Sequence, residues 1–277
     1  MPCHSLAIRA GMNFPGKKKL RHWWWIVAFK YPWVRVALTR ALVRSRNMDV
    51  SMFGAPLHIN SREEIGLLRA ARMADENVIF RDEVATLLNL AMLLQPRDTF
   101  VDVGANVGIY SSVLSRFGHV FPETRWYAIE PNPATVQRLR KSLAKTPVTI
   151  WNLGASDQAG ERGFEPGVTS GVFRVVADSA GAASVRCERL DSLPLAGDQI
   201  VIKIDVEGHE GPVLRGADRL FENERVKVVY IDGFNDAQIP AFLEARGFKL
   251  FDGRTLLPCA APDYSLMAIH HTRLARS

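Results

Sequence analysis

The chain has 277 residues, with 35 Lys or Arg against 29 Asp or Glu and a formal net charge of +6. Hydrophobic residues make up 47% and charged residues 23%, a balance that excludes a wholly disordered chain, a collagen and a mucin. No apolar run reaches the roughly 18 residues that a membrane-spanning helix needs. The cysteines Cys3, Cys187 and Cys259 form no Cys-x-x-Cys pair. We therefore expect no disulfide framework or zinc site, a reducing compartment and a cytoplasmic location.

The excess of basic charge lies in an N-terminal arm, residues 1–48. The arm holds ten Lys or Arg residues and no Asp or Glu, whereas residues 49–277 hold 25 basic and 29 acidic residues. It also holds four of the six tryptophans, Trp23, Trp24, Trp25 and Trp33. The favoured interpretation is that its apolar side packs against the rest of the chain. Peripheral contact of residues 16–46 with a membrane surface comes second, since Trp favours the membrane–water boundary and Lys and Arg favour anionic headgroups. Nucleic-acid binding is the least favoured.

Beyond the arm, helical and strand patterns alternate. Residues 49–95 form a helical lead-in, in which residues 82–95 show a helical pattern that ends at Pro96. In residues 96–277, we predict strands at 99–103, 125–129, 148–153, 199–205, 225–231, 248–251 and 265–269. We predict helices at 109–117, 133–145, 210–221 and 237–246. Residues 154–190, rich in Gly, Ser and Val, predict a small β-insertion. This alternation indicates an α/β fold, with a mostly parallel sheet and helices on both faces.

In such sheets a ligand lies beyond the carboxyl ends of the strands. The first predicted strand is followed by a turn with Gly104, Asn106 and Gly108, and Glu130 ends the second strand. The turn offers backbone N–H groups to an anionic group, and a strand-end carboxylate accepts hydrogen bonds from ribose hydroxyls. Asn106 stands where a dinucleotide-binding turn has its middle glycine, which leaves less room for a pyrophosphate. The pattern therefore favours a cofactor with adenosine and an amino-acid tail over NAD.

Four segments also carry a resemblance to a known family. They are residues 101–108 (Val-Asp-Val-Gly-Ala-Asn-Val-Gly), 130–133 (Glu-Pro-Asn-Pro), 155–161 (Ala-Ser-Asp-Gln-Ala-Gly-Glu) and 203–210 (Lys-Ile-Asp-Val-Glu-Gly-His-Glu). In this order they closely resemble the FkbM-type family of S-adenosylmethionine-dependent methyltransferases, over roughly residues 80–270. The resemblance implies a Rossmann-like class I methyltransferase fold of seven strands, the last antiparallel. It implies O-methylation of a hydroxyl on a sugar, glycan, glycolipid or secondary metabolite.

The resemblance also implies where the cofactor, S-adenosyl-L-methionine, binds. Gly104, Asn106 and Gly108 would line its methionine part, and Asp102 would support their turn. Glu83, on the helix before the first strand, would reach the amino-acid end.

The nucleoside part has its own set of residues by the same resemblance. Glu130 would hold the ribose, with Asn132 beside it, and Ala155 and Ser156 would meet the adenine. One departure is Asp232, which stands where the family often has Glu, so this carboxylate has a shorter reach.

Transfer of a methyl group from a sulfonium depends mainly on positioning, but a hydroxyl acceptor must also lose its proton. Our first candidate for the base or substrate anchor is Asp205, at the end of the fourth strand. His209 is second, because its ordinary pKa suits proton transfer at neutral pH. Glu207 is third; like His209, it has the alternative reading of a residue that only begins a helix. We expect Lys203 to pair with a carboxylate.

A few other readings stay open. Asp205 and Asp232 could share a divalent cation, but two carboxylates are thin evidence, and we predict no metal. One rival function is an RNA methyltransferase that uses the basic arm. Another is a non-catalytic adaptor that binds the cofactor or a membrane. A nicotinamide-dependent oxidoreductase is disfavoured by Asn106 and by the lack of a Tyr-x-x-x-Lys pair.

Overall fold

The structure is a computed structural model that describes residues 41, 43–72, 78–166, 173–176, 183–233, 236–260 and 265–274. The chain divides into two units, Met1–Arg44 and Ser45–Ser277. The Trp cluster and nearly all of the basic arm lie outside the described residues, so the interpretations of the arm stay predictions. In the part of the chain that is described, no helix has the length and apolar character to cross a membrane.

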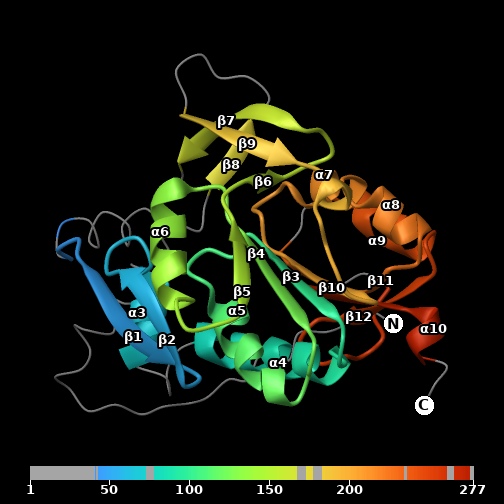
Figure 1. Ribbon diagram of the computed structural model, residues 1–277, viewed down its shortest axis with the longest axis horizontal. Coiled ribbons are helices and arrows are strands. Elements are labelled where there is room, and N and C mark those ends of the chain that lie inside the picture. Colours follow the sequence, from blue (N-terminus) through green and yellow to red (C-terminus); the bar gives the residue numbers. More distant parts are fainter. Residues whose placement is uncertain are drawn as a thin grey trace, which may run out of the picture. The chain divides into compact units, whose positions relative to one another are not determined.

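A seven-stranded sheet forms the centre of the second unit (Figure 1). Its strands are β3 (Thr99–Val103), β4 (Arg125–Ile129), β5 (Val148–Trp151), β10 (Ile200–Ile204), β11 (Val226–Asp232), β12 (Phe248–Asp252) and β13 (Ser265–His270). Their order is β12-β13-β11-β10-β3-β4-β5. β13 runs antiparallel to both of its neighbours, and the other pairs are parallel. The predicted sheet, with its last strand antiparallel, is confirmed.

The strands at the middle of this sheet are buried on both faces, as their sequences predict. All five residues of β3 and all five of β10 are buried. Strands covered on both sides read as continuous apolar runs rich in β-branched residues. Within these two runs, Asp102 and Lys203 are the charged exceptions, and each therefore needs a partner.

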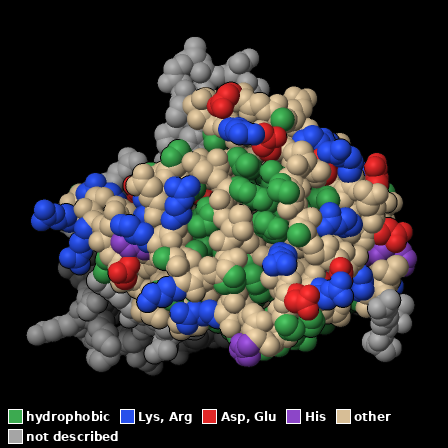
Figure 2. Space-filling model, viewed as in Figure 1, with side chains coloured by type: hydrophobic (Ala, Val, Ile, Leu, Met, Phe, Trp, Pro, Cys, Tyr) green, Lys and Arg blue, Asp and Glu red, His purple; other side chains and the backbone are tan. Residues whose placement is uncertain are grey.

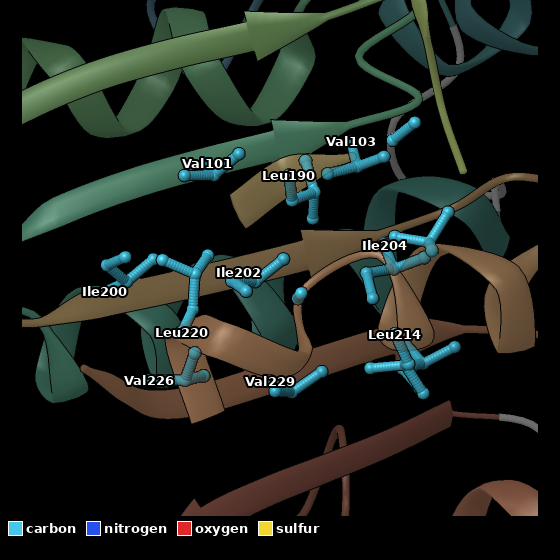
Figure 3. Packing of buried hydrophobic residues seen from close by; sticks show 14 of the residues in the cluster. Val101, Val103, Leu190, Ile200, Ile202, Ile204, Leu214, Leu220, Val226 and Val229 are labelled. Atoms are coloured by element: carbon cyan, nitrogen blue, oxygen red, sulfur yellow. The ribbon is translucent and has the colours of Figure 1, made fainter. Parts of the chain in front are cut away.

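Helices cover both faces of the sheet. One face packs against α4 (Val78–Leu93), α5 (Ile109–Leu114) and α6 (Pro133–Ser142), through residues such as Leu90, Leu114 and Leu139. The other packs against α7 (Glu210–Arg215), α8 (Asp218–Glu222) and α9 (Gln238–Glu244). Figure 3 shows this second core, where Leu214 and Leu220 lie against the strand side chains. The single helix predicted for residues 210–221 is thus two helices. Short elements complete this unit: η2 (Ser115–His119), η3 (Leu190–Ser192) and α10 (His271–Leu274).

The lead-in differs from the prediction, because residues 49–95 are not helical throughout. β1 (Asn47–Met52) and β2 (Ala55–Asn60) form an antiparallel hairpin, and the helices α3 (Ile65–Arg72) and α4 follow. Phe53 and Gly54 both have positive φ, 51° and 74°, as the two central residues of a type I′ hairpin turn do. In β2, Leu57 and Ile59 alternate with more exposed residues and bury one face. This alternation was the sequence signal for a strand.

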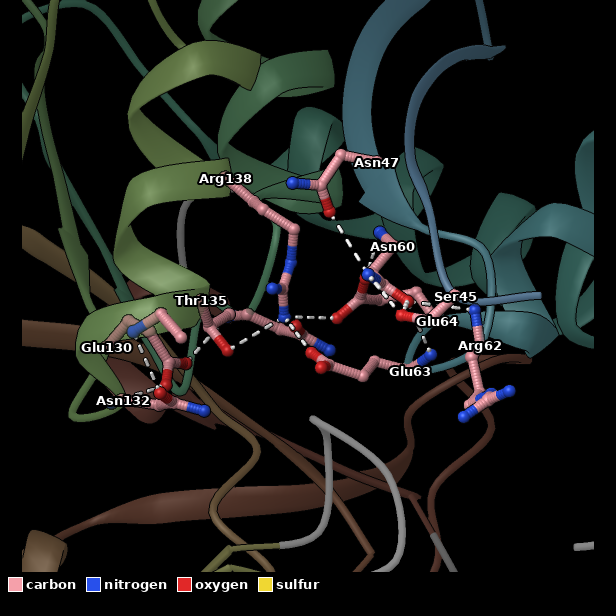
Figure 4. Close-up of polar contacts among 12 residues, drawn as sticks. Ser45, Asn47, Asn60, Arg62, Glu63, Glu64, Glu130, Asn132, Thr135 and Arg138 are labelled. Atoms are coloured by element: carbon pink, nitrogen blue, oxygen red, sulfur yellow. Dashed lines mark hydrogen bonds and ion pairs between the residues drawn. The ribbon is translucent and has the colours of Figure 1, made fainter. Parts of the chain in front are cut away.

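The hairpin and α3 are tied to the turn after β3 and to α6. Their apolar side chains form one cluster with Val107, in the turn after β3. Arg138 of α6 donates to Glu63 Oε2 at 2.6 Å and to Glu64 Oε1 at 2.8 Å (Figure 4). Glu64 Oε2 in turn accepts the backbone N–H of Asn60. A buried ion pair therefore joins the end of the hairpin to the helix that follows Glu130.

The predicted β-insertion is confirmed. β6 (Gly154–Ala155), β7 (Gly160–Pro166), β8 (Phe173–Val176) and β9 (Ala183–Glu188) form a separate sheet in the order β6-β9-β7-β8. It follows β5 directly, and Figure 1 shows it above the carboxyl end of β5. On the face seen in Figure 2, basic and acidic side chains are interspersed among the described residues, and hydrophobic side chains gather near the middle.

Candidate functional site

The turn between β3 and α5 has a backbone that glycine makes possible. Gly104, Asn106 and Gly108 all have positive φ, 74°, 50° and 87°. A Cβ added at Gly104 would collide with the backbone carbonyl oxygen of Asp205, so no other residue fits there without a shift. The N–H of Gly104 is held by the carbonyl of Ile129 at 3.0 Å. The turn is thus packed between the ends of β4 and β10.

Glu130 connects the end of β4 to this turn. Its buried carboxylate accepts the backbone N–H of Asn106 at 3.0 Å and that of Asn132 at 2.9 Å. Burial raises the pKa of Glu130 to about 7, although both N–H groups act in the opposite direction. Asn132 begins α6, and its Oδ1 accepts the N–H of Ala134 at 3.0 Å. The structure thus brings Glu130 and Asn132 beside the turn, where an acidic strand end can receive hydroxyl groups.

Asp102 lies beneath the turn and is buried. Its Oδ2 accepts the backbone N–H of Ser111 at 3.2 Å and the Ser111 hydroxyl at 2.7 Å. Its Oδ1 is 3.1 Å from Lys203 Nζ. Because Ser111 belongs to the first turn of α5, these contacts fix the start of the helix relative to β3 and β10.

Lys203 stands at the centre of the charged groups, and its side chain is 3% exposed. Nζ donates to the carbonyl oxygen of Gly104 at 3.2 Å and to Asp205 Oδ2 at 3.4 Å. Burial by itself would lower the pKa of Lys203, but the carboxylates of Asp102 and Asp205 outweigh it and hold that pKa above its usual value. The expected pairing of Lys203 with a carboxylate is confirmed. Asp205 is the more open partner, with a side chain that is 38% exposed.

Two further carboxylates face this lysine. Glu83 of α4 is hydrogen-bonded to Tyr110, and burial raises its pKa to about 7. Its Oε2 is buried without a hydrogen-bond partner among the described residues. Asp232, at the end of β11, is hydrogen-bonded to Tyr230; burial and the nearby carboxylate of Asp205 raise its pKa to about 6. Acidic groups therefore outnumber the single lysine, which suits a cationic ligand.

The structure places His209 in different surroundings from Asp205. Its Nε2 lies 3.1 Å from the hydroxyl of Ser156, which donates to Asp157 Oδ1 at 3.2 Å. Burial, reinforced by the Arg162 guanidinium, lowers the pKa of His209. Ser156 and its neighbour Ala155 are buried at the start of the β-insertion. His209 therefore lies with the residues expected near the adenine.

The two remaining carboxylates of this segment have separate places. Glu207 is exposed and has a positive φ of 49°. Glu210 is buried in the first turn of α7 and accepts the N–H of Gly208 at 2.7 Å. Among Asp205, His209 and Glu207, Asp205 is thus the one paired with Lys203 beside the turn between β3 and α5.

Sequence reasoning missed Tyr110 and Tyr230. The pattern within its own strand does not single out Tyr230, whose place follows from the register: Lys203 pairs with Asp102 on one side and with Tyr230 on the other. Each of three adjacent buried strands therefore carries a polar residue at the same level. Tyr110 lies close to this row, with 5.1 Å between Lys203 Nζ and the centroid of its ring.

The comparisons with known proteins agree with this geometry. The family model "Methyltransferase FkbM domain" matches residues 102–250. The chain belongs to the FkbM methyltransferase family. The hexuronic acid methyltransferase AglP of Haloferax volcanii is 30% identical over 204 residues, which are 71% of this chain and 78% of AglP. The chain is therefore an S-adenosylmethionine-dependent methyltransferase with a Rossmann-like class I fold.

Solved structures of other methyltransferases match at low similarity. Precorrin-6y C5,15-methyltransferase from Geobacter metallireducens has a TM-score of 0.38 and 19% identity, and the match covers 70% of this chain and 89% of that one. A TehB-like methyltransferase from Corynebacterium glutamicum has a TM-score of 0.40 and 15% identity, covering 76% and 97%. The assignment to a class I methyltransferase fold therefore rests on the strand order of the sheet and on the family match, and these structures add no argument to it.

The residues at the site fit the cofactor. S-adenosylmethionine is cationic at its sulfonium and at its ammonium group, and the site offers the carboxylates of Glu83 and Asp232. The buried Oε2 of Glu83, which lacks a partner among the described residues, suits an ammonium group in particular. Glu130 suits the ribose hydroxyls.

Proposed function

We propose that this chain transfers the methyl group of S-adenosylmethionine to an oxygen of a sugar, in a glycan, a glycolipid or another hydroxyl-bearing metabolite. The observation that carries the proposal is Asp205, a partly exposed carboxylate held by Lys203 beside the turn of residues 104–108, here called the cofactor turn. The relationship to AglP, which is named for hexuronic acid, supports an acceptor of the sugar type.

The chain has two tasks in such a reaction. The bound cofactor supplies a methyl group that is already activated by its positive sulfur. The turn at Gly104 and the carboxylate of Glu130 bind the cofactor and fix its orientation, which accounts for much of the acceleration in a displacement of this kind. Asp205 receives the proton of the acceptor hydroxyl and so strengthens the attacking oxygen. A carboxylate that is hydrogen-bonded on one side and open on another can do this without moving.

A methyl-transfer assay with labelled cofactor tests this function. The acceptor panel contains neutral sugars, hexuronic acids, extracted glycans and glycolipids, small hydroxylated metabolites and RNA. We expect label in the sugar-containing fractions. Asp205→Asn should lower that label at least a hundredfold, and Lys227→Met, which alters a buried lysine away from the site, should retain it.

The other outcomes separate the rival functions. Label found only in RNA would refute the sugar acceptor and support an RNA methyltransferase. Cofactor binding without transfer to any acceptor class would support a non-catalytic adaptor.

A further inference from the structure

Lys203 touches both parts of the site. On one side, Nζ donates to the carbonyl oxygen of Gly104, in the turn that binds the cofactor. On the other side, it donates to Asp205 Oδ2, the carboxylate that faces the acceptor in the proposed function. Asp102 anchors the ammonium group from below at 3.1 Å. Three polar partners thus contact one buried cation.

The packing around Lys203 leaves its ammonium group little freedom. The side chain is 3% exposed and its strand neighbours Ile202 and Ile204 are fully buried. The ring of Tyr110 lies over the ammonium group, with 5.1 Å between Nζ and the ring centroid. A flexible surface lysine would lose its geometry readily, but this one is held by the sheet and by α5.

We propose that Lys203 is a positioning residue that fixes the cofactor turn and the Asp205 carboxylate relative to each other. This inference rests on the proposed function, in which Asp205 takes the proton of the acceptor. Lys203 remains out of contact with the reacting atoms and acts through Gly104 and Asp205. A displacement of either by a fraction of an ångström changes the alignment of donor and acceptor, on which transfer depends steeply.

The chain contains a matched control. Lys227 on β11 has a side chain that is also 3% exposed and forms an ion pair with Asp98 at 2.5 Å. It lies near the amino end of its strand, whereas Lys203 lies near the carboxyl end. Replacing either lysine by Met removes a buried cation of similar length from the same sheet. A loss of stability alone should therefore affect both variants alike.

The experiment compares Lys203→Met with Lys227→Met in the full chain. We measure the dissociation constant of S-adenosylmethionine by calorimetry, and KM for the cofactor and kcat for methyl transfer. We expect Lys203→Met to weaken cofactor binding about tenfold, as the loss of a charged hydrogen bond does, and to lower kcat by about a hundredfold. Lys227→Met should leave both within about twofold. If Lys203→Met stays within twofold of the wild type in both quantities, or if Lys227→Met matches its losses, the positioning role is wrong.

Coupling to Asp205 gives a second readout. If Lys203 acts through Asp205, the double variant Lys203→Met/Asp205→Asn should have a kcat close to that of the worse single variant. If the kcat losses of the two single variants multiply in the double variant, Lys203 and Asp205 act independently and the coupling is wrong. Should Asp205→Asn alone keep the wild-type rate, the proposed base is wrong, and the cofactor affinity of Lys203→Met still decides the effect on the turn.

Lys203→Met leaves the buried Asp102 without its cation, so it could fail to fold. Asp102→Asn/Lys203→Met removes both charges while keeping the shapes, and it serves as the replacement. The same losses of cofactor affinity and kcat are expected. Wild-type values in this variant would overturn the proposal.

Discussion

Asp205 is held in a way that separates its proposed chemical role from binding of the cofactor. Its carboxylate contacts Lys203, whereas its backbone carbonyl lies against Gly104 and is unchanged by a substitution of the side chain. We expect Asp205→Asn to lower kcat for methyl transfer at least a hundredfold, because an amide cannot accept the acceptor's proton. The dissociation constant of the cofactor should change less than about threefold. Labelled-cofactor turnover and calorimetry measure the two quantities. If Asp205→Asn keeps more than a tenth of the wild-type rate, Asp205 is not the base.

We expect Glu83 and Glu130 to make cofactor binding depend on pH. Burial raises the pKa of each to about 7, so each is largely protonated at pH 6 and ionised at pH 8. In the predicted mode of binding, ionised Glu83 attracts the cofactor's ammonium group and ionised Glu130 accepts its ribose hydroxyls. Affinity should therefore rise about tenfold from pH 6 to pH 8 through Glu83 alone.

Titration calorimetry between pH 6 and pH 8 checks this dependence. Glu83→Gln should flatten the part of the rise that Glu83 causes, and Glu130→Gln provides the comparison for the ribose side. An affinity that is level over this range in the wild type, or a Glu83→Gln variant with an unchanged rise, would contradict the assignment.

The same raised pKa values bear on stability, with a definite sign. A carboxyl whose pKa is higher in the folded chain than in the unfolded one binds its proton more tightly when folded. Its contribution to stability is complete below the unfolded pKa, near 4.5, and is lost as the pH rises through about 7. Unfolding by urea should show the cofactor-free chain less stable at pH 8 than at pH 6. Glu83→Gln should reduce that difference, since it removes one of these two groups. A difference as large in this variant as in the wild type would be evidence against the raised pKa of Glu83.

At the scale of elements, the hairpin of β1 and β2 is joined to α6 by the ion pair of Arg138 and Glu64. Their side chains are 7% and 1% exposed. Breaking a buried pair leaves an uncompensated charge, which costs about 3 kcal/mol. Arg138→Met should lower the free energy of unfolding by about that amount. The exposed pair of Arg97 and Asp198 is the control, since its loss through Arg97→Met should cost under about 1 kcal/mol.

Urea unfolding of the two variants measures this difference. Because the hairpin and α3 form one cluster with Val107 of the cofactor turn, Arg138→Met should also weaken binding of the cofactor. Equal losses of stability in the two variants would mean that the buried pair does not hold the hairpin.

Sequence reasoning could predict the elements whose cause lies within a few neighbouring residues, and it missed those that depend on contacts between distant parts of the chain. β3 and β10 are apolar runs within five residues, and Gly104 and Glu130 follow strand ends, so sequence reasoning found all of them. The hairpin at residues 47–60 was missed because its alternation is short and was assigned to the helical lead-in. The contact of Arg138 with Glu64 spans 74 positions of the chain. The row of Asp102, Lys203 and Tyr230 exists only through strand register, which periodicity within one strand does not give.

At the scale of the whole molecule, the excess of basic charge and the candidate site residues lie in different units. Residues 1–44 carry nine basic residues and no acidic ones, whereas residues 45–277 carry 26 basic and 29 acidic residues. All the candidate residues for cofactor and catalysis lie in the second unit. The +6 of the whole chain is therefore the sum of +9 in the first unit and −3 in the second, and it describes neither unit.

This division predicts that the arm can be removed without loss of cofactor binding. Residues 45–277 should bind S-adenosylmethionine within about twofold of the full chain. A cut at residue 45 is better than one at 49, since Ser45 and Arg46 contact Asn60 and Ser61 at the end of the hairpin. Peripheral membrane contact, the second interpretation of the arm, predicts that the full chain sediments with vesicles that contain anionic lipid, because each basic residue near such a surface adds about 1 kcal/mol. The shortened chain should remain in solution with the same vesicles. Binding of both chains to vesicles would place the lipid contact in the second unit, and loss of binding to the cofactor on truncation would show that the arm takes part in the site.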